Sequence, residues 1–154
     1  MKWHQKYSTL ITEIISILFI LLFVYAAVSK LINIERFKVQ LSQSPLLTTY
    51  SNWVAWFVPL TELIIVIALL IPRYRLVGLY GCLGLMSAFS MYIIAILNFS
   101  DYIPCSCGGI LDKMGWTEHL VFNIVFVVLA IVGIFLKTNM PSKRDKNIKQ
   151  YIRT

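Results

Sequence analysis

Charged residues are the most obvious shortage in this sequence. Asp, Glu, Lys and Arg make up only 14% of the 154 residues, whereas 58% are hydrophobic. A soluble domain of this length needs far more polar residues to cover its surface. The composition therefore excludes an ordinary water-soluble domain. The mean hydropathy of +0.76 indicates that lipid is the solvent for much of the molecular surface.

Acidic residues are scarcer still, with seven Asp and Glu against fourteen Lys and Arg, which gives a formal net charge of +7. In a soluble protein this excess would suggest nucleic-acid binding. In a membrane protein, basic residues set the topology and contact anionic lipids, and we favour that interpretation. The sequence also lacks a Gly-rich phosphate loop, a Ser-His-Asp arrangement, a nucleic-acid module, an internal repeat and a long linker. Residues 1–154 are therefore expected to form a single membrane domain.

Four hydrophobic segments are long enough to cross a hydrocarbon core, which takes about 20 residues of helix. Only the turn Arg73-Tyr74-Arg75 separates the second segment from the third, so these two helices should be antiparallel neighbours. We expect an all-α membrane protein, an antiparallel four-transmembrane-helix bundle followed by a basic cytoplasmic tail at 137–154. The four predicted spans are residues 10–30, 53–71, 76–98 and 117–136.

The Lys and Arg residues are unevenly distributed among the connections. Ten lie in the N-terminal tail, the second connection and the C-terminal tail. Four lie on the other side, namely Lys30 at the end of the first span and three in the first and third connections. Because Lys and Arg favour the cytoplasmic side, both termini are predicted to be cytoplasmic. The third connection then faces outward, into the periplasm if the host is a Gram-negative bacterium. A cleaved signal peptide is disfavoured because the first hydrophobic run is too long and has no polar cleavage region.

The first connection, residues 31–51, mixes hydrophobic and polar residues. This pattern predicts a short amphipathic helix lying on the membrane surface and ending near Ser44-Pro45. Its apolar residues are Ile34, Phe37, Val39 and Leu41.

Cysteine is rare, and two of the three cysteines lie one residue apart in Cys105-Ser106-Cys107-Gly108-Gly109. Disulfides persist outside the cytoplasm, so a pair that faces outward can be oxidised. A disulfide across one intervening residue closes a small, strained ring that is easily reduced. We favour redox exchange. A structural disulfide, free thiols and half of a metal site, with His119 as the nearby third ligand, stay open as alternatives.

The third cysteine, Cys82, lies in the third span. At 1.5 Å per residue it is roughly 24 Å along the helix from Asn98, so it cannot bond to the other two cysteines without unfolding of the bundle. Its neighbours at helical spacing are small, which predicts a face for close helix packing. That face comprises Gly78, Gly81, Cys82, Gly84 and Ala88.

Four further polar residues fall within or beside the predicted spans. An intramembrane carboxylate such as Glu62 is costly and needs a partner, and Lys30 at the end of the first span is the obvious one. The pair could lock two helices together, or it could accept a proton from the dithiol. His119 and Asn123 are four residues apart and share a face of the fourth helix. His119 is either a proton relay or a solvated or capping residue at the helix start.

The order and spacing of three motifs resemble those of the MauE/DoxX family of small bacterial four-helix membrane proteins. The motifs are Tyr25-Ala26-Ala27-Val28-Ser29-Lys30-Leu31, Pro59-Leu60-Thr61-Glu62 and Pro104-Cys105-Ser106-Cys107-Gly108-Gly109. The resemblance implies a redox-associated inner-membrane protein. MauE-type members support disulfide formation in exported proteins beside a thioredoxin-like partner, and DoxX relatives are linked to quinone-coupled oxidation of sulfur compounds. Carried over, Cys105 and Cys107 would be the redox pair, and Lys30 and Glu62 the intramembrane ion pair.

The function expected from residues and resemblance together is thiol–disulfide exchange. Electrons would pass between a periplasmic thioredoxin-like partner and the quinone pool through Cys105 and Cys107, with His119 relaying protons. Quinone is inferred from the relatives and from the need for a carrier. One alternative is a non-enzymatic assembly subunit with a structural Cys105–Cys107 disulfide. The other is a small transporter component that uses Glu62 and Lys30.

Overall fold

The structure is a computed structural model, and it describes residues 2–43, 48–99 and 115–139. Within these ranges the chain is entirely helical outside its turns. The elements are α1 (Lys2–Ile32), α2 (Ile34–Gln43), the short 3₁₀ helix η1 (Thr48–Tyr50), α3 (Ser51–Leu70), α4 (Arg75–Phe99) and α5 (Trp116–Thr138). The expectation of an all-α protein is confirmed for this part of the chain.

Four helical stretches are long and apolar enough to cross a membrane, as the sequence predicts. They are Tyr7–Ile32, Thr48–Leu70, Arg75–Asn98 and Trp116–Thr138. Helix α1 begins well before the predicted start of the first span, because the polar residues ahead of that span continue the same helix. The other boundaries agree to within a few residues, apart from an earlier start to the second stretch, which includes η1.

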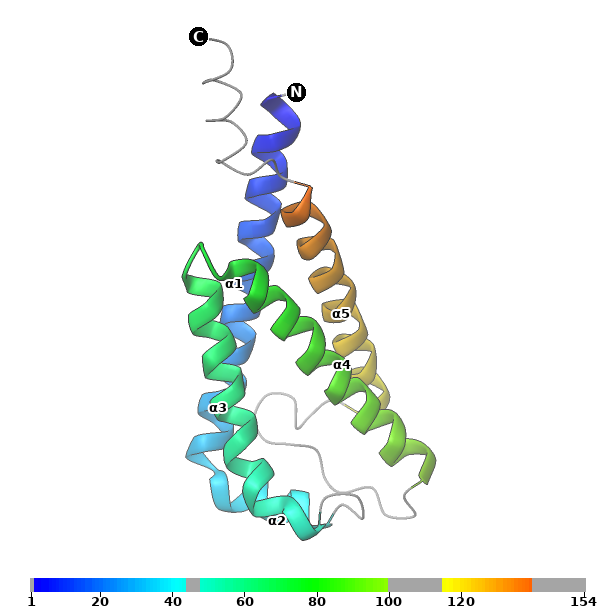
Figure 1. Cartoon of the computed structure of the whole chain (residues 1–154). Coiled ribbons are helices and arrows are strands. Elements are labelled where there is room, and N and C mark those ends of the chain that lie inside the picture. The colour runs from blue at the N-terminus through cyan, green and yellow to red at the C-terminus, as the bar shows by residue number, and fades with distance from the viewer. Residues whose placement is uncertain (1, 44–47, 100–114, 140–154) are drawn as a thin grey trace.

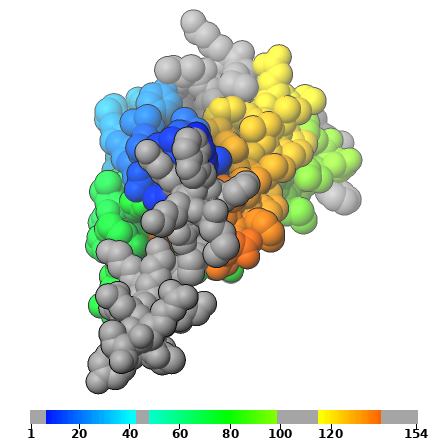
Figure 2. Space-filling view, turned by 90° about the horizontal axis from the view of Figure 1, so that it is seen from above, coloured from blue at the N-terminus to red at the C-terminus, as the bar shows by residue number. Residues whose placement is uncertain are grey.

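The four long helices form a ring in which each packs against two neighbours. Helix α1 packs on α3 and α5, and α4 packs on the same two helices (Figure 1). Helices α3 and α4 are neighbours, as the short connection predicts, and their turn is closed by a hydrogen bond from the Tyr74 N–H to the Ile71 carbonyl at 2.9 Å. Viewed from above, the N-terminal part of α1 lies between the α3–α4 region and the end of α5 (Figure 2).

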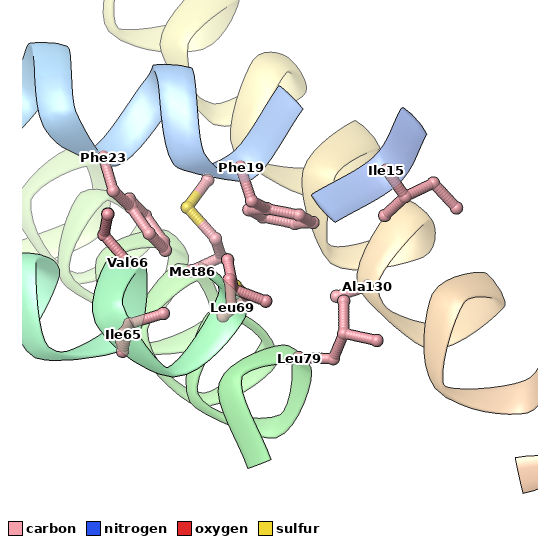
Figure 3. Close-up of a cluster of buried hydrophobic side chains, with 10 residues drawn as sticks. Ile15, Phe19, Phe23, Ile65, Val66, Leu69, Leu79, Met86 and Ala130 are labelled. Carbon is pink, nitrogen blue, oxygen red and sulfur yellow. The ribbon is translucent and has the colours of Figure 1, made fainter. Parts of the chain in front are cut away.

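The core is built from one face of each long helix. On α1 the buried residues recur every fourth position, at Ile15, Phe19, Phe23 and Ala27, which places them on a single face. Ile15, Phe19 and Phe23 meet side chains of the other three helices, including Leu69, Leu79, Met86 and Ala130 (Figure 3). The opposite faces are also apolar: Leu21, Val77 and Phe135 are 64%, 63% and 67% exposed. An apolar exterior of this extent fits a lipid environment.

Close packing of α4 against α3 depends on glycine. A Cβ atom at Gly78 would lie 2.8 Å from Leu69 Cδ2, and one at Gly81 would lie 2.9 Å from Ile65 Cγ1. Cys82 is fully buried on the same helix, so its predicted packing role is supported. The predicted small-residue face does not extend to Gly84 and Ala88, however. Gly84 has no atom within 4 Å of a Cβ position, and Ala88 is exposed.

The first connection contains the predicted short helix, α2, but its apolar face is not free to lie on lipid. Phe37 and Leu41 are buried against Ala55 of α3. Val39, which was predicted to share the apolar face, is 54% exposed because it lies on another side of the helix. Helix α2 is therefore packed on the bundle, where it brings Phe37 toward the site described next.

Candidate functional site

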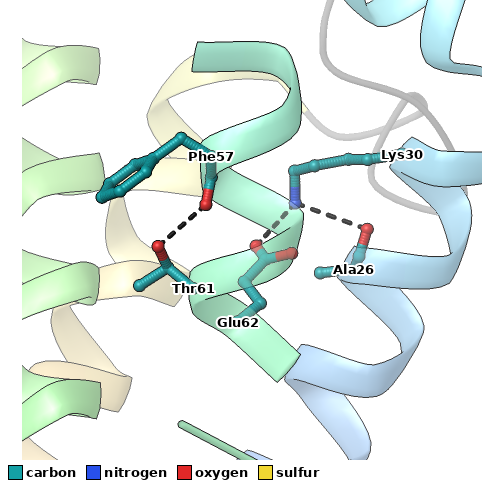
Figure 4. Close-up of polar contacts among 5 residues, drawn as sticks. All are labelled: Ala26, Lys30, Phe57, Thr61 and Glu62. Carbon is teal, nitrogen blue, oxygen red and sulfur yellow. Dashed lines mark hydrogen bonds and ion pairs between the residues drawn. The ribbon is translucent and has the colours of Figure 1, made fainter. Parts of the chain in front are cut away.

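Glu62 lies on α3 one turn after Pro59, and both residues are fully buried. Proline has no backbone N–H, so the helix loses one internal hydrogen bond at this point. The next turn is reinforced by Thr61, whose hydroxyl donates to the Phe57 carbonyl at 2.8 Å. The carboxylate of Glu62 faces α1, where Lys30 Nζ donates to its Oε1 at 2.7 Å (Figure 4). The two side chains that the sequence pairs are thus in contact, and their role in a functional site stays a prediction.

Lys30 also has neighbours on its own helix and on α2 and α4. Its ammonium donates to the Ala26 carbonyl, one turn earlier on α1, at 3.4 Å. It lies 6.0 Å from the ring centre of Phe37 on α2 and 5.7 Å from that of Phe89 on α4. Aromatic faces attract cations at this range, so the rings compensate part of the hydration that the ammonium has lost. The Lys30 side chain is 16% exposed, whereas that of Glu62 is wholly inaccessible.

A cavity of about 310 Å³ adjoins the ion pair. It brings together the C-terminal halves of α1 and α4 with the N-terminal halves of α3 and α5, and α2 closes part of it. Its wall is mainly apolar and aromatic, with few polar groups, as is usual for sites that bind small molecules. The polar and aromatic lining residues most relevant to chemistry are Lys30, Glu62, Phe89, Tyr92, His119 and Asn123.

Two buried polar atoms in the cavity wall have no hydrogen-bond partner among the described residues. One is Glu62 Oε2, an acceptor, and the other is Asn123 Nδ2, a donor. Buried polar groups are almost always hydrogen-bonded, and leaving one unsatisfied costs about 1–3 kcal/mol. Two such atoms in one cavity are unusual, and they come from α3 and α5, which lie diagonally across the ring of helices. This pair of atoms identifies the cavity as the candidate site.

His119 lies half-buried in the cavity wall, one helical turn before Asn123 on the same face of α5, as predicted. The His119 side chain does not cap the start of α5. Gly115 is the N-cap residue, and its N–H donates a hydrogen bond to Glu118 Oε2 at 3.1 Å. A place in the cavity wall is compatible with proton relay. That role stays a prediction.

Cys105 and Cys107 belong to residues 100–114 and lie outside the described residues. The predictions made for them stay predictions. Of the described chain on either side, Phe99 ends α4 and Trp116 begins α5, and Trp116 lines the cavity. Among the described residues, no group of three His, Cys, Asp or Glu side chains is arranged to hold a metal ion.

Sequence reasoning did not single out the aromatic residues of the wall or the unsatisfied amide of Asn123. In the sequence, Phe37 is one apolar residue of a predicted surface helix, and Phe89 is one of many apolar residues in a predicted span. The only sequence signal was the helical spacing of Asn123 from His119. Which side chains surround a buried polar group depends on how five helices meet, and a single sequence does not report that.

The family model described as Methylamine utilisation protein MauE matches residues 8–136. The chain belongs to the MauE family. The matched region runs from the second turn of α1 almost to the end of α5, so it contains both the ion pair and the cavity. Together with the four apolar helices, it identifies a multi-pass membrane protein. No curated protein and no solved structure matches this chain. The MauE part of the resemblance is confirmed, and the DoxX part stays a prediction.

Proposed function

We propose that this MauE-family protein is a thiol–disulfide redox protein of the bacterial inner membrane. It exchanges electrons between a periplasmic thioredoxin-like protein and the quinone pool, and so supports disulfide formation or maturation of exported proteins. The observation that carries the proposal is the buried Lys30–Glu62 pair in the wall of an aromatic cavity. Disulfide chemistry releases or consumes protons, and this is the ionisable group best placed to exchange them inside the bundle.

The proposed topology is an antiparallel bundle with cytoplasmic termini. It is supported by the distribution of Lys and Arg along the sequence. It is also supported by Arg75, at the start of α4, whose Nη1 lies 3.6 Å from Glu13 Oε1 in the N-terminal half of α1. This contact keeps the basic α3–α4 turn and the basic N-terminal segment at one end of the bundle, and the cavity lies toward the other end.

The proposed chemistry is two consecutive exchanges. A thiolate of the partner attacks one sulfur of the Cys105–Cys107 disulfide and forms a mixed disulfide, which the partner's second thiolate resolves. The partner is thereby oxidised to its disulfide, and Cys105 and Cys107 are reduced to thiols. A quinone then takes two electrons and two protons from these thiols, which restores the disulfide and yields a quinol. With quinol as the donor, the same steps run in reverse.

The family description names methylamine utilisation. None of the residues discussed above indicates methylamine as a substrate, so the proposal places this chain in the maturation of exported proteins rather than in amine chemistry itself. Its immediate substrate is then a dithiol or disulfide of another protein.

Trapping of the mixed disulfide tests the proposal. Variants Cys105→Ser and Cys107→Ser, each in a Cys82→Ala background, leave one thiol, which can attack the disulfide of an oxidised partner as in the reverse direction. The second cysteine, which would release the adduct in that direction, is missing. Mass spectrometry of non-reduced, alkylated membranes should identify a thioredoxin-fold protein joined to at least one variant. The Cys82→Ala parent should show little adduct, because both redox cysteines remain. The absence of an adduct from both single-thiol variants would exclude thiol exchange.

A further inference from the structure

The cavity beside the ion pair has more polar capacity than the protein itself uses. Lys30 occupies only Oε1 of Glu62, and Oε2 has no partner among the described residues. Across the bundle, the Nδ2 donor of Asn123 is likewise without a described partner. A carboxylate oxygen accepts hydrogen bonds and an amide N–H donates them. The matching ligand therefore carries a hydroxyl or carbonyl oxygen at more than one edge.

The rest of the wall excludes a purely polar ligand. The side chains around the two polar atoms include Phe23, Phe89, Phe122 and Trp116, together with aliphatic residues of α1, α3 and α4. Water can satisfy one polar atom, but it gains nothing from an aromatic wall. A flat ring gains both from burial of its apolar area and from stacked or edge-on contacts with these side chains. The wall thus selects an aromatic or quinonoid ring with oxygen substituents.

The depth of the cavity selects a ligand that dissolves in lipid. Glu62 is eleven residues from the start of α3 at Ser51, which is roughly 16 Å of helix. His119 is three residues from the start of α5, which is roughly 5 Å. The cavity therefore extends from the end of the bundle to well inside the apolar spans, at a depth that an isoprenoid-tailed compound can reach from the membrane.

We infer that this cavity binds the head group of a membrane quinone and that the buried Glu62 and Asn123 side chains turn toward it on binding, so that Asn123 Nδ2 donates to a quinone carbonyl and Glu62 Oε2 accepts from a quinol hydroxyl. The inference rests on the proposed function, because oxidation of a dithiol yields two electrons and two protons. A quinone accepts both within the lipid phase. The two unsatisfied atoms, on diagonally opposed helices, then meet oxygens at two edges of one ring. Lys30 holds the Glu62 carboxylate in place through its other oxygen.

The test uses the purified full-length protein and a photoreactive azido-naphthoquinone with a short isoprenoid tail. After illumination, the labelled peptides are identified by mass spectrometry, and the apparent Kd is measured by competition with unlabelled menaquinone. We expect saturable labelling of segments that line the cavity, among them residues 86–93 of α4 and 116–123 of α5. Labelling confined to residues that do not line the cavity, or occupancy by phospholipid alone in the purified protein, would overturn the inference.

Two variants and one control locate the site. Asn123→Leu removes the donor while it conserves size, and it should raise the Kd about five- to tenfold, the usual range for one net hydrogen bond in an apolar site. Val58→Trp fills the cavity from α3 and should abolish labelling. Val125→Leu, at an exposed position on α5, serves as the matched control and should leave the Kd unchanged. Equal binding by all three variants would overturn the inference.

The test of quinone binding and the test of thiol exchange can fail independently of each other. If mixed disulfides form but the quinone probe does not bind, the cavity assignment is wrong and thiol exchange stands. If the probe binds as described but no mixed disulfide forms, the cavity assignment stands and thiol exchange is wrong.

Discussion

Lys30 holds Glu62 by one carboxylate oxygen at 2.7 Å, and the second oxygen is buried without a partner among the described residues. A pair that only locked two helices together would be expected to saturate both oxygens, because each unsatisfied buried acceptor weakens the fold. The half-satisfied carboxylate is thus better suited to meeting a ligand or a proton than to stabilising the bundle. This distinction can be tested.

Removal of one or both partners of the ion pair separates the two roles. Lys30→Met leaves the Glu62 carboxylate buried and alone, and it should lower the free energy of unfolding by about 3–5 kcal/mol. The double variant Lys30→Met/Glu62→Leu should recover most of that loss, because no buried charge remains. Thermal unfolding in detergent measures the loss of stability in the single variant and its recovery in the double variant. Electron transfer to quinone should stay lost in the double variant; its return with stability would show that the pair is only structural.

The exposed pair Glu35–Lys38 on α2 provides the matched control. Its atoms are 2.9 Å apart, but the Glu35 side chain is 82% exposed. Exposed pairs contribute about 0–1 kcal/mol. Lys38→Met should therefore change neither unfolding nor activity measurably.

The close approach of α3 and α4 predicts a sharp difference among the glycines of α4. Gly78→Ala would place a Cβ 2.8 Å from Leu69 Cδ2 and 3.0 Å from the Leu69 backbone nitrogen, so the helices must separate. The cost should be about 1–3 kcal/mol, as for other overpacked cores. Gly84→Ala, where a Cβ meets nothing within 4 Å, should be neutral or stabilise the helix by about 0.5–1 kcal/mol. Equal unfolding temperatures for the two variants would contradict this packing.

Thiol accessibility should distinguish the three cysteines. After mild reduction of intact spheroplasts, a membrane-impermeant maleimide should label Cys105 and Cys107, which are predicted to face the periplasm. Cys82 is free and fully buried in the core, so it should react only after denaturation. Labelling of single-cysteine variants, measured by mass shift, gives the result for each site. Labelling of Cys105 and Cys107 only after membrane disruption would contradict the predicted topology.

Replacement of His119 tests the proton relay. His119→Phe keeps a ring in the cavity wall but removes the titratable nitrogens. We expect the variant to form mixed disulfides at the normal rate and to reduce quinone about a hundredfold more slowly, the lower end of general acid–base effects. The pH dependence of the quinone step should also flatten, because the variant has no titratable ring nitrogen at this place. A wild-type rate and pH profile in His119→Phe would exclude the relay.

The long helices were predictable because hydrophobic length alone defines a membrane span. The Lys30–Glu62 contact was predictable as well, since a buried intramembrane charge requires a partner and few candidates exist. The packing of α2 was not. An amphipathic helix suits a membrane surface and a protein groove equally well, and only the position of Ala55 on α3 decides that Phe37 is covered by protein.

The cavity was also beyond sequence reasoning. Asn123 is one polar residue in an apolar helix, and a hydrogen bond to a neighbouring helix would be its ordinary role. Its amide nitrogen instead meets no described partner, and Asn123 and Glu62 of the diagonally opposite helix α3 both line the cavity. Such a space arises from the angles at which helices pack, which are properties of the assembled bundle.

The redox state of Cys105 and Cys107 in living cells tests the central claim most directly. Acid quenching followed by alkylation with a mass-tagged maleimide reports the fractions of dithiol and disulfide. Thiol–disulfide exchange coupled to the membrane predicts a mixed population that shifts when respiratory quinone synthesis is blocked and recovers when quinone is supplied. A population that remains wholly oxidised, or wholly reduced, through both changes would contradict the account.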